Sequence, residues 1–484
     1  MCCGLYWAIG RNQMDRLFSV REAAEMAQCT LVYEGRSIRS TSISGVATDS
    51  RKVGRDFLFV ALKGERTDGH RFLRQAVENG ASAVLIDHSY TRSPEYRDEL
   101  HDVEIPILTH ENPLRALQLL AAEYLREFPQ LLKIGITGSN GKTTTKELLA
   151  AILSEVAATV KNEGNLNSDI GLPLSVFKVR QRHHFGVFEM GINHVGEMQT
   201  MVDVLHPHYG LITNIGSAHI GLLGSREGIA REKGSLFSSL PADGIGFIPD
   251  TFEWREYYTR ICRAPLVPFG TESTVGVHKT VNRHLKGWTI VYENVRIQFC
   301  LPGIHNLNNA MAAIQVARTL GARPEQIKAG LEKYEPLQGR SQIIEGAVTI
   351  VQDSYNANAE SVIAILSTLQ DAAAGRLIVV LGAMKELGDK AEASHRKVGS
   401  AIANINASAV FLFGDEMEFA YQEALQQGFQ SVLKHTNDFK ELSRLVSEYV
   451  QPKDTVLLKG SRSMELERLV PALEQKFNTQ QGNS

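Results

Sequence analysis

Short apolar runs alternate with helical patterns along most of the chain. This alternation is typical of βαβ units, which build a largely parallel sheet, and it predicts an α/β fold. The predicted strands cover residues 56–62, 83–86, 131–137, 185–189, 209–214, 244–248, 348–352, 377–381, 410–413 and 455–458. Helical spacing is clearest over 114–128, which Pro129 ends, and after residue 141. From 267 to 300 the pattern alternates and predicts a small antiparallel addition to the middle of the chain.

A chain of 484 residues is too long for one hydrophobic core, because single cores stop growing near about 250–300 residues. We expect three domains, over residues 14–129, 130–336 and 337–484. The first residues have Arg11 as their only charge and no small-residue cleavage pattern, which makes a poor signal peptide. We interpret Met1 to Gln13 as a dispensable extension.

Charge and cysteine content narrow the classes of function. Fifty-one Lys and Arg against 54 Asp and Glu give a net charge of -3, which offers no broad basic surface for nucleic acid. No apolar run approaches the roughly 18–20 residues of a membrane span. The five cysteines lack metal-binding or redox spacing, which suits a reducing cytoplasm, and we predict no disulfide.

The segment from Gly138 to Thr143 closes an apolar strand and opens an amphipathic helix. In such a loop the backbone N–H groups and the helix N-terminus face a phosphate, a lysine reaches the terminal phosphates and a hydroxyl ligates magnesium. Lys142 and Thr143 have those two positions. Five residues separate Gly135 from Gly141, so the loop is not the commonest variant. A chance glycine turn is the alternative, but the strand and helix on either side favour an ATP-binding loop.

Three residues near other strand ends are candidates for chemistry. Glu189 ends the predicted strand 185–189, where a carboxylate can ligate magnesium, although solvated strand ends look the same. His219 follows the strand 209–214, and a lone histidine there is more often structural. Lys233 alone would be an ordinary surface lysine.

Taken together, these motifs resemble a known family. Thr137-Gly138-Ser139-Asn140-Gly141-Lys142-Thr143-Thr144, Glu189-Met190-Gly191, His219, Lys233, His305-Asn306-Leu307-Asn308-Asn309 and Gly339-Arg340 occur in the order seen in the Mur ligases. The resemblance to these amide-forming cell-wall enzymes extends from one end of the chain to the other.

The resemblance implies where ATP binds. The loop residues expected to hold its phosphates are Gly138, Ser139, Asn140, Gly141, Lys142, Thr143 and Thr144. Asn306 and Asn309 would meet the adenine edge, to which an amide offers both a donor and an acceptor. Arg340 would contact the phosphates and Asp353 the ribose. Helix capping after Pro302-Gly303 and a plain linker arginine are the alternative interpretations.

The resemblance also implies two magnesium ions. Thr143 would ligate one, and Glu189, His219 and Lys233 would hold the second after carbon dioxide carbamylates the lysine. A carbamate is an anionic oxygen donor like a carboxylate, whereas an ammonium cannot bind a cation. The catalytic residues would then be Lys142, Glu189, His219, Lys233 and Arg340.

Both ends of the chain resemble the family member that adds a final dipeptide. Thr48-Asp49-Ser50-Arg51 is similar to a uridine-diphosphate-binding segment, which implies nucleotide-sugar contacts for Ser50 and Arg51, although such residues also make polar turns. Residues 353–358 and 384–388 are similar to the dipeptide-adding member. Beside them, Ala359 stands where the family often has proline and Ala383 where it often has aspartate. The remaining residues implied to bind substrate are Asn165, Asn167, Tyr355, Asn356 and Asn358.

The expected protein is therefore an ATP-dependent ligase of peptidoglycan synthesis. The resemblance implies that it joins D-alanyl-D-alanine to UDP-N-acetylmuramoyl-tripeptide through an acyl phosphate, in the cytoplasm and as a monomer. Its fold would have an N-terminal α/β UDP-binding domain, a central P-loop-type parallel sheet and a C-terminal Rossmann-like domain that closes about a hinge near residues 337–342. A tripeptide-forming Mur ligase, a folate-type glutamate ligase and a nucleotide-binding regulator without enzymatic activity are the alternatives.

Overall fold

The computed structural model describes residues 16–33, 42–64, 67–96, 104–373 and 375–481. The predicted extension, Met1 to Gln13, lies outside these residues. Within them, the chain up to Lys133 together with Val160–Met190 and Gln199–His206 forms one compact unit. The second unit contains Ile134–Thr159, Gly191–Met198 and the chain from Pro207 onward.

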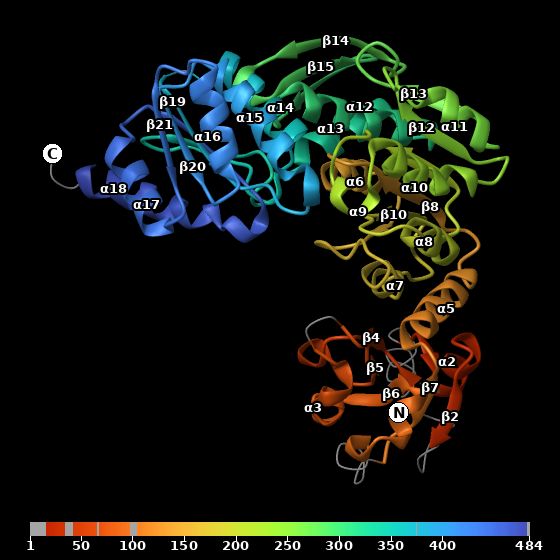
Figure 1. Ribbon diagram of the computed structural model, residues 1–484. Helices are drawn as coiled ribbons and strands as arrows, with labels where there is room; N and C mark the ends of the chain where they lie inside the picture. The colour runs from red at the N-terminus through yellow and green to blue at the C-terminus, as the bar shows by residue number, and fades with distance from the viewer. Residues whose placement is uncertain (1–15, 34–41, 65–66, 97–103, 374, 482–484) are drawn as a thin grey trace, which may run out of the picture. The chain divides into compact units, whose positions relative to one another are not determined.

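The N-terminal part of the first unit is built on a five-stranded sheet of order β2-β7-β6-β5-β4 (Figure 1). Strands β4 to β7 run parallel and β2 is antiparallel to β7. The elements are β1 Phe18–Ser19, α2 Val20–Met26, β2 Thr30–Tyr33, β3 Ser42–Ile43, β4 Gly45–Ala47, β5 Phe57–Val60, α3 Leu73–Glu78, β6 Ala81–Asp87, β7 Ile107–His110 and α5 Pro113–Arg126. The strands predicted over 56–62 and 83–86 and the helix over 114–128 are confirmed as β5, β6 and α5.

The central sheet has the order β13-β12-β11-β8-β10-β9. Its strands are β8 Leu132–Thr137, β9 Thr159–Lys161, β10 Phe185–Glu189, β11 Tyr209–Ile212, β12 Ile245–Pro249 and β13 Leu266–Phe269. The pairs β8/β11, β11/β12 and β12/β13 are parallel, which confirms the predicted P-loop-type parallel sheet. The helices of this region are α6 Lys142–Ser154, α7 Gly171–Val176, α8 Glu197–Leu205, α9 Ile220–Leu223, α10 Arg226–Ser238, α11 Arg255–Ile261, α12 Ile304–Thr319 and α13 Pro324–Lys333.

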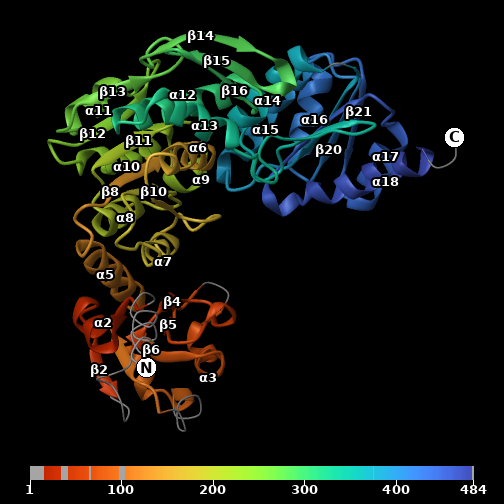
Figure 2. The same ribbon diagram turned by 180° about the vertical axis from the view of Figure 1, so that it is seen from behind.

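The predicted antiparallel addition over 267–300 is shorter than expected. Strands β14 Val277–Asn282, β15 Trp288–Tyr292 and β16 Val295–Phe299 do form an antiparallel sheet. The preceding strand β13 instead joins the central parallel sheet, because the apolar run after α11 completes a βαβ crossover from β12. Helix α6 packs against α12 and α13, and the three lie side by side in both ribbon views (Figure 2).

The C-terminal part is a doubly wound sheet of order β17-β18-β22-β19-β20-β21. Its elements are β17 Gln342–Ile344, β18 Thr349–Gln352, α14 Ala359–Ala372, β19 Leu377–Gly382, α15 Ala391–Ala403, β20 Ala409–Phe413, α16 Met417–Gln426, β21 Val432–Thr436, α17 Phe439–Tyr449, β22 Thr455–Lys459 and α18 Leu469–Gln481. Strands β18, β22, β19, β20 and β21 run parallel to one another, and β17 is antiparallel to β18. The Rossmann-like prediction is therefore confirmed, with one added edge strand.

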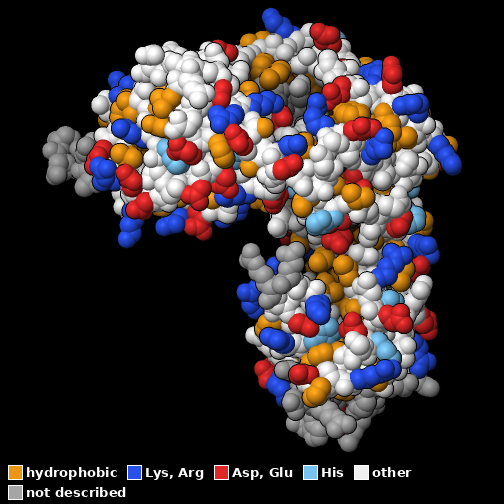
Figure 3. All heavy atoms as spheres, viewed as in Figure 1, with side chains coloured by type: hydrophobic (Ala, Val, Ile, Leu, Met, Phe, Trp, Pro, Cys, Tyr) orange, Lys and Arg blue, Asp and Glu red, His pale blue; other side chains and the backbone are white. Residues whose placement is uncertain are grey.

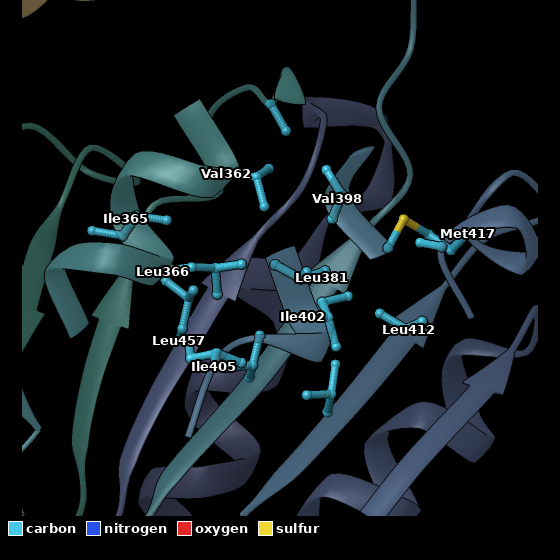
Figure 4. Close-up of a cluster of buried hydrophobic side chains, with 14 of the residues drawn as sticks. Val362, Ile365, Leu366, Leu381, Val398, Ile402, Ile405, Leu412, Met417 and Leu457 are labelled. Atoms are coloured by element: carbon cyan, nitrogen blue, oxygen red, sulfur yellow. The ribbon is translucent and has the colours of Figure 1, made fainter. Parts of the chain in front are cut away.

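Side chains of the C-terminal sheet alternate between two hydrophobic clusters. Leu381 and Leu457 point toward α14, α15 and α16 (Figure 4). Their neighbours Val380 and Leu458 pack with residues of α17 and α18. Because strands covered on both faces are apolar at every position, periodicity alone shows a run rather than an alternation. The polar residues are therefore left to the ends of these strands.

The surface agrees with the charge balance of the sequence. Figure 3 shows acidic and basic side chains interspersed over the face in view. Cys29, Cys262 and Cys300 are free thiols, and burial raises the pKa of Cys29 to about 12. None of the described helices is both long and apolar enough to cross a membrane.

Candidate active site

The loop between β8 and α6 has the geometry that a phosphate requires. Gly138 and Gly141 have φ of 144° and 80°, and Gly141 is the N-cap of α6, which has no side-chain cap hydrogen bond. A Cβ on Gly138 would lie 1.9 Å from Thr213 Oγ1, and one on Gly141 would lie 2.3 Å from Asn309 Oδ1. Only glycine fits both positions, because the backbone lies close to its neighbours. No side chain caps the N-terminus of α6, which is where loops of this kind bind an anion.

Lys142 and the segment after β11 hold this loop in shape. Lys142 Nζ donates a hydrogen bond to the Gly138 carbonyl at 2.8 Å. Asn214 Oδ1 accepts from the backbone N–H of Asn140 at 3.0 Å, and Ser139 Oγ accepts from the Gly216 N–H at 2.8 Å. Thr143 and Thr144 lie in the first turn of α6 and are buried. The predicted loop residues therefore lie together as one preformed turn.

A chain of hydrogen bonds connects α6 to the C-terminal sheet. Thr145 Oγ1 donates to Asn309 Oδ1 at 3.3 Å, and Asn309 Nδ2 donates to Asn306 Oδ1 at 3.3 Å. Asn306 Nδ2 donates to Ser341 Oγ at 3.3 Å, and the Ser341 N–H donates to Asp353 Oδ1 at 3.0 Å. The residues predicted to meet adenine and ribose are thereby brought into one polar network.

The capping interpretation of the two asparagines is wrong. The cap of α12 is Gly303, which makes no side-chain cap hydrogen bond, and both asparagines lie inside the helix. Asn306 and Asn309 are buried, and Asn306 Nδ2 also donates to the Pro302 carbonyl at 2.8 Å. Both amides are hydrogen-bonded within the protein, as buried polar groups usually are, so they belong to the interior of α12 rather than to its cap.

Arg340 lies in the linker between α13 and β17. Its guanidinium carbon is 4.0 Å from the centre of the Tyr355 ring, a cation–π contact. Gly339 accepts from the Tyr355 N–H at 3.0 Å. Arg340 is therefore both a linker arginine and a cation held at the edge of the candidate nucleotide site.

The predicted dipeptide residues have local structural roles as well. Asn358 is the N-cap of α14, and its Nδ2 donates to Asn140 Oδ1 of the phosphate loop at 2.7 Å. Asn356 Oδ1 accepts from the Ala357 N–H at 2.9 Å. Ala359 stands at the first position of α14, which proline also occupies well, so this departure from the family leaves the element unchanged.

His219 and Lys233 come from the segment that follows β11. His219 has a φ of 62° and its Nδ1 lies 3.0 Å from Glu386 Oε2, although Nδ1 makes no hydrogen bond of good geometry among the described residues. The imidazole nevertheless lowers the pKa of the Glu386 carboxyl, and burial opposes that effect. Lys233 lies in α10 and is only 1% exposed, so it is no ordinary surface lysine.

Glu189 belongs to the other compact unit. It is buried at the end of β10, and its Oε1 accepts from Asn167 Nδ2 at 2.6 Å. Asn165, also predicted to bind substrate, is exposed. Nowhere in the described part of the chain do three His, Cys, Asp or Glu side chains form a cluster that could hold a metal ion. A carbamylated lysine is not one of these four residue types, so this finding does not bear on a site that includes Lys233.

Ser50 and Arg51 lie in a short 3₁₀ helix of the N-terminal domain. Ser50 Oγ donates to Gln75 Oε1 at 2.7 Å, and the Arg51 guanidinium pairs with Asp49, whose side chain also caps this turn. The polar-turn interpretation of these residues is thus correct for their local structure. Their role with a nucleotide sugar stays a prediction.

Residues that were not singled out as site residues complete the network. Ser341 connects Asn306 to Asp353, and Lys459 Nζ donates to Asp353 Oδ2 at 2.7 Å. The available signal for Lys459 was its position, because it follows a predicted strand in a chain of βαβ units, as Asp353 does. Their pairing could not be predicted, because it depends on which strands are neighbours in the sheet.

Comparisons with known proteins cover nearly the whole chain. Three family models match it: "Mur ligase family, catalytic domain" over residues 42–125, "Mur ligase middle domain" over 136–317 and "Mur ligase, glutamate ligase domain" over 339–462. The UDP-N-acetylmuramoyl-tripeptide–D-alanyl-D-alanine ligase of Treponema pallidum is 38% identical, and the match covers 95% of this chain and 100% of the relative.

Two solved structures are similar as well. A crystal structure of MurF from Acinetobacter baumannii has a TM-score of 0.83 and 30% identity, and the match covers 95% of this chain and 99% of that one. MurF from Thermotoga maritima in complex with ADP has a TM-score of 0.77 and 26% identity, over 90% and 98% of the two chains.

Proposed function

The chain belongs to the Mur ligase family, and we propose that it joins D-alanyl-D-alanine to UDP-N-acetylmuramoyl-tripeptide with consumption of ATP. The observation that carries this proposal is the full-length similarity to relatives that are named for this reaction. The product is the UDP-muramoyl pentapeptide of peptidoglycan synthesis. Similarity to a structure that contains ADP supports ATP as the second substrate.

The reaction needs activation because a carboxylate is a poor electrophile. An oxygen of the tripeptide's terminal carboxylate attacks the γ-phosphorus of ATP, the bond from that phosphorus to the bridging oxygen breaks, and ADP leaves. The amine of D-alanyl-D-alanine then attacks the acyl carbon, and the C–N bond forms as inorganic phosphate leaves with the C–O electron pair. The amine nitrogen loses its surplus proton to solvent or a base.

The polar network supports the proposed contacts with the nucleotide. The N-terminus of α6 and the Lys142 ammonium suit the phosphates, because both place positive charge where negative charge develops. In this proposal Asn306 and Asn309 meet the adenine, Asp353 accepts from the ribose hydroxyls and Arg340 neutralises phosphate. The tight glycine positions described above support this assignment.

Magnesium would supply electrostatic stabilisation of the transferred phosphoryl group. Thr143 fits one ion, because its hydroxyl stands in the first turn of the helix behind the phosphate loop. The proposed ligands of a second ion are Glu189, His219 and carbamylated Lys233. Lys233 is only 1% exposed, which supports a role inside the protein rather than that of a surface lysine.

The remaining substrate contacts are also proposals. Ser50 and Arg51 would hold the uridine diphosphate, and Asn165, Asn167, Tyr355, Asn356 and Asn358 would contact the peptide parts. We propose that the protein acts in the cytoplasm and as a monomer. Closure about the linker 337–342 would exclude water, which otherwise hydrolyses an acyl phosphate.

A coupled phosphate-release assay tests the proposal. Purified chain is mixed with Mg-ATP, D-alanyl-D-alanine and a panel of UDP-muramoyl tripeptides that differ in their third residue. Parallel reactions combine UDP-muramoyl dipeptides with single amino acids, and folate with glutamate. The expected result is phosphate release only with a tripeptide and the dipeptide together, and none from a Lys142→Met control. Release with a dipeptide acceptor and a single amino acid, or with glutamate and folate, would refute the proposal.

A further inference from the structure

Lys459 is a buried cation that the proposed mechanism does not use. It ends β22 and is only 2% exposed. Its Nζ donates to Asp353 Oδ2 at 2.7 Å and to the Asn356 carbonyl at 3.2 Å. We propose that Lys459 is a positioning residue of the nucleotide site, which acts through Asp353 on the linker that carries Arg340. This inference rests on the proposed function, because it takes Asp353 as a nucleotide contact.

Asp353 has one fixed partner for each carboxylate oxygen. Oδ2 accepts from Lys459, and Oδ1 accepts from the Ser341 N–H at 3.0 Å. A carboxylate oxygen has two acceptor positions, so each oxygen keeps one for a ribose hydroxyl. Lys459 therefore sets the plane of the carboxylate and leaves it able to accept from a ligand.

The linker between α13 and β17 has a conformation that needs such support. Gly339 and Ser341 both have positive φ, at 73° and 49°, and Ser341 is buried although it carries a side chain. A non-glycine residue keeps this backbone only where its surroundings hold it. The Ser341 N–H is held by Asp353 and its Oγ by Asn306. Arg340 lies between Gly339 and Ser341 in the linker and faces the Tyr355 ring.

The location of the Lys459–Asp353 pair favours a role in the site over a role in stability. Gln352 and Leu458 are partners in the register of β18 and β22, so Asp353 and Lys459 lie at the carboxyl ends of adjacent parallel strands. Ligands of doubly wound folds bind at that edge. A buried ion pair by itself contributes little to stability compared with well-packed apolar side chains.

The same sheet provides a matched control at its opposite edge. Arg376 and Asp454 precede β19 and β22, and the guanidinium donates to both carboxylate oxygens, Nε to Oδ1 at 2.9 Å and Nη2 to Oδ2 at 2.8 Å. This pair also joins a cation to an aspartate across neighbouring strands, although here the aspartate is the more buried partner, whereas in the Lys459–Asp353 pair it is the lysine. Arg376→Met thus removes a comparable ion pair far from the carboxyl ends of the strands.

Calorimetric titration of the full chain with Mg-ADP, and separately with a UDP-muramoyl tripeptide, tests the inference. Lys459→Met is expected to raise the Kd for Mg-ADP about 10-fold or more and to change the Kd for the nucleotide sugar by less than about twofold. Arg376→Met should lower the melting temperature yet change both Kd values by less than about twofold. In an Asp353→Asn background, Lys459→Met should weaken Mg-ADP by less than about a further twofold, because it acts through that carboxylate.

Three results would overturn the inference: Mg-ADP binding by Lys459→Met within about twofold of wild type, an equal loss in Arg376→Met, or an undiminished effect in the Asp353→Asn background. If Lys459→Met fails to fold, Lys459→Gln takes its place under the same thresholds, because its neutral and shorter side chain holds the Asp353 carboxylate less firmly. A wild-type chain that binds Mg-ADP but joins no substrates would refute the proposed function alone.

Discussion

Gly141→Ala should disrupt the phosphate loop by two separable effects. The first is backbone strain, because φ is 80° at this residue and an L side chain there costs about 1–2 kcal/mol. The second is a clash, because the new Cβ would lie 2.3 Å from Asn309 Oδ1. Asn309 must then move, and its hydrogen bonds with Thr145 and Asn306 are lost. Leaving these buried groups without partners costs about 1–3 kcal/mol.

Gly321→Ala separates the two effects. Gly321 follows α12 with a φ of 86°, and nothing lies within 4 Å of a Cβ placed there. The control should therefore lose only the backbone contribution of about 1–2 kcal/mol, whereas Gly141→Ala should lose about 2–5 kcal/mol. Urea unfolding of both variants measures the difference, and calorimetry with Mg-ADP should show weakened binding for Gly141→Ala alone. Equal unfolding free energies together with wild-type nucleotide affinity would refute the reasoning.

Two further predictions concern Lys233 and His395. Lys233→Ala should lose phosphate release and recover part of it with added small carboxylates, which would stand in for the carbamate; full activity without them would exclude the modification. Burial lowers the pKa of His395 from 6.5, and both ring nitrogens are engaged, with Met384 N–H donating to Nε2 and Nδ1 facing the Ala391 carbonyl. The unfolded chain therefore binds the proton first as pH falls, so the unfolding free energy should decrease from about pH 7 to about pH 5.5, and more steeply than in His395→Gln. Parallel pH profiles of the two proteins would contradict this assignment.

The elements that carry the site could be predicted because their signals are local. The loop before α6 combines an apolar strand, two glycines and Lys142 within a few positions, and each of these constraints acts between sequence neighbours. The strands of the C-terminal sheet are apolar on both faces, so continuous apolar runs in the sequence predicted them. Strands β17 and β21 were not predicted, because Gln342–Ile344 is short and Val432–Thr436 is partly polar at the sheet edge.

The contacts between these elements could not be predicted in the same way. Ser341 looks like an ordinary linker residue, and its left-handed backbone follows from hydrogen bonds with Asp353 and Asn306, 12 and 35 positions away. Glu386 likewise reaches His219 only because the fold brings their segments together. Such contacts depend on the order of strands in a sheet, which periodicity does not determine.

The two ion pairs of the C-terminal sheet show which information the sequence pattern lacks. Lys459–Asp353 and Arg376–Asp454 use the same kinds of charge and both join neighbouring strands, so residue type cannot distinguish them. Strand direction can, because the first pair lies after β18 at the end where β22 finishes, and the second lies before β19 and β22 begin. In a parallel sheet the carboxyl edge is where loops present groups to a ligand. Once the topology is known, the same chemistry therefore predicts a positioning role at one edge and only stability at the other.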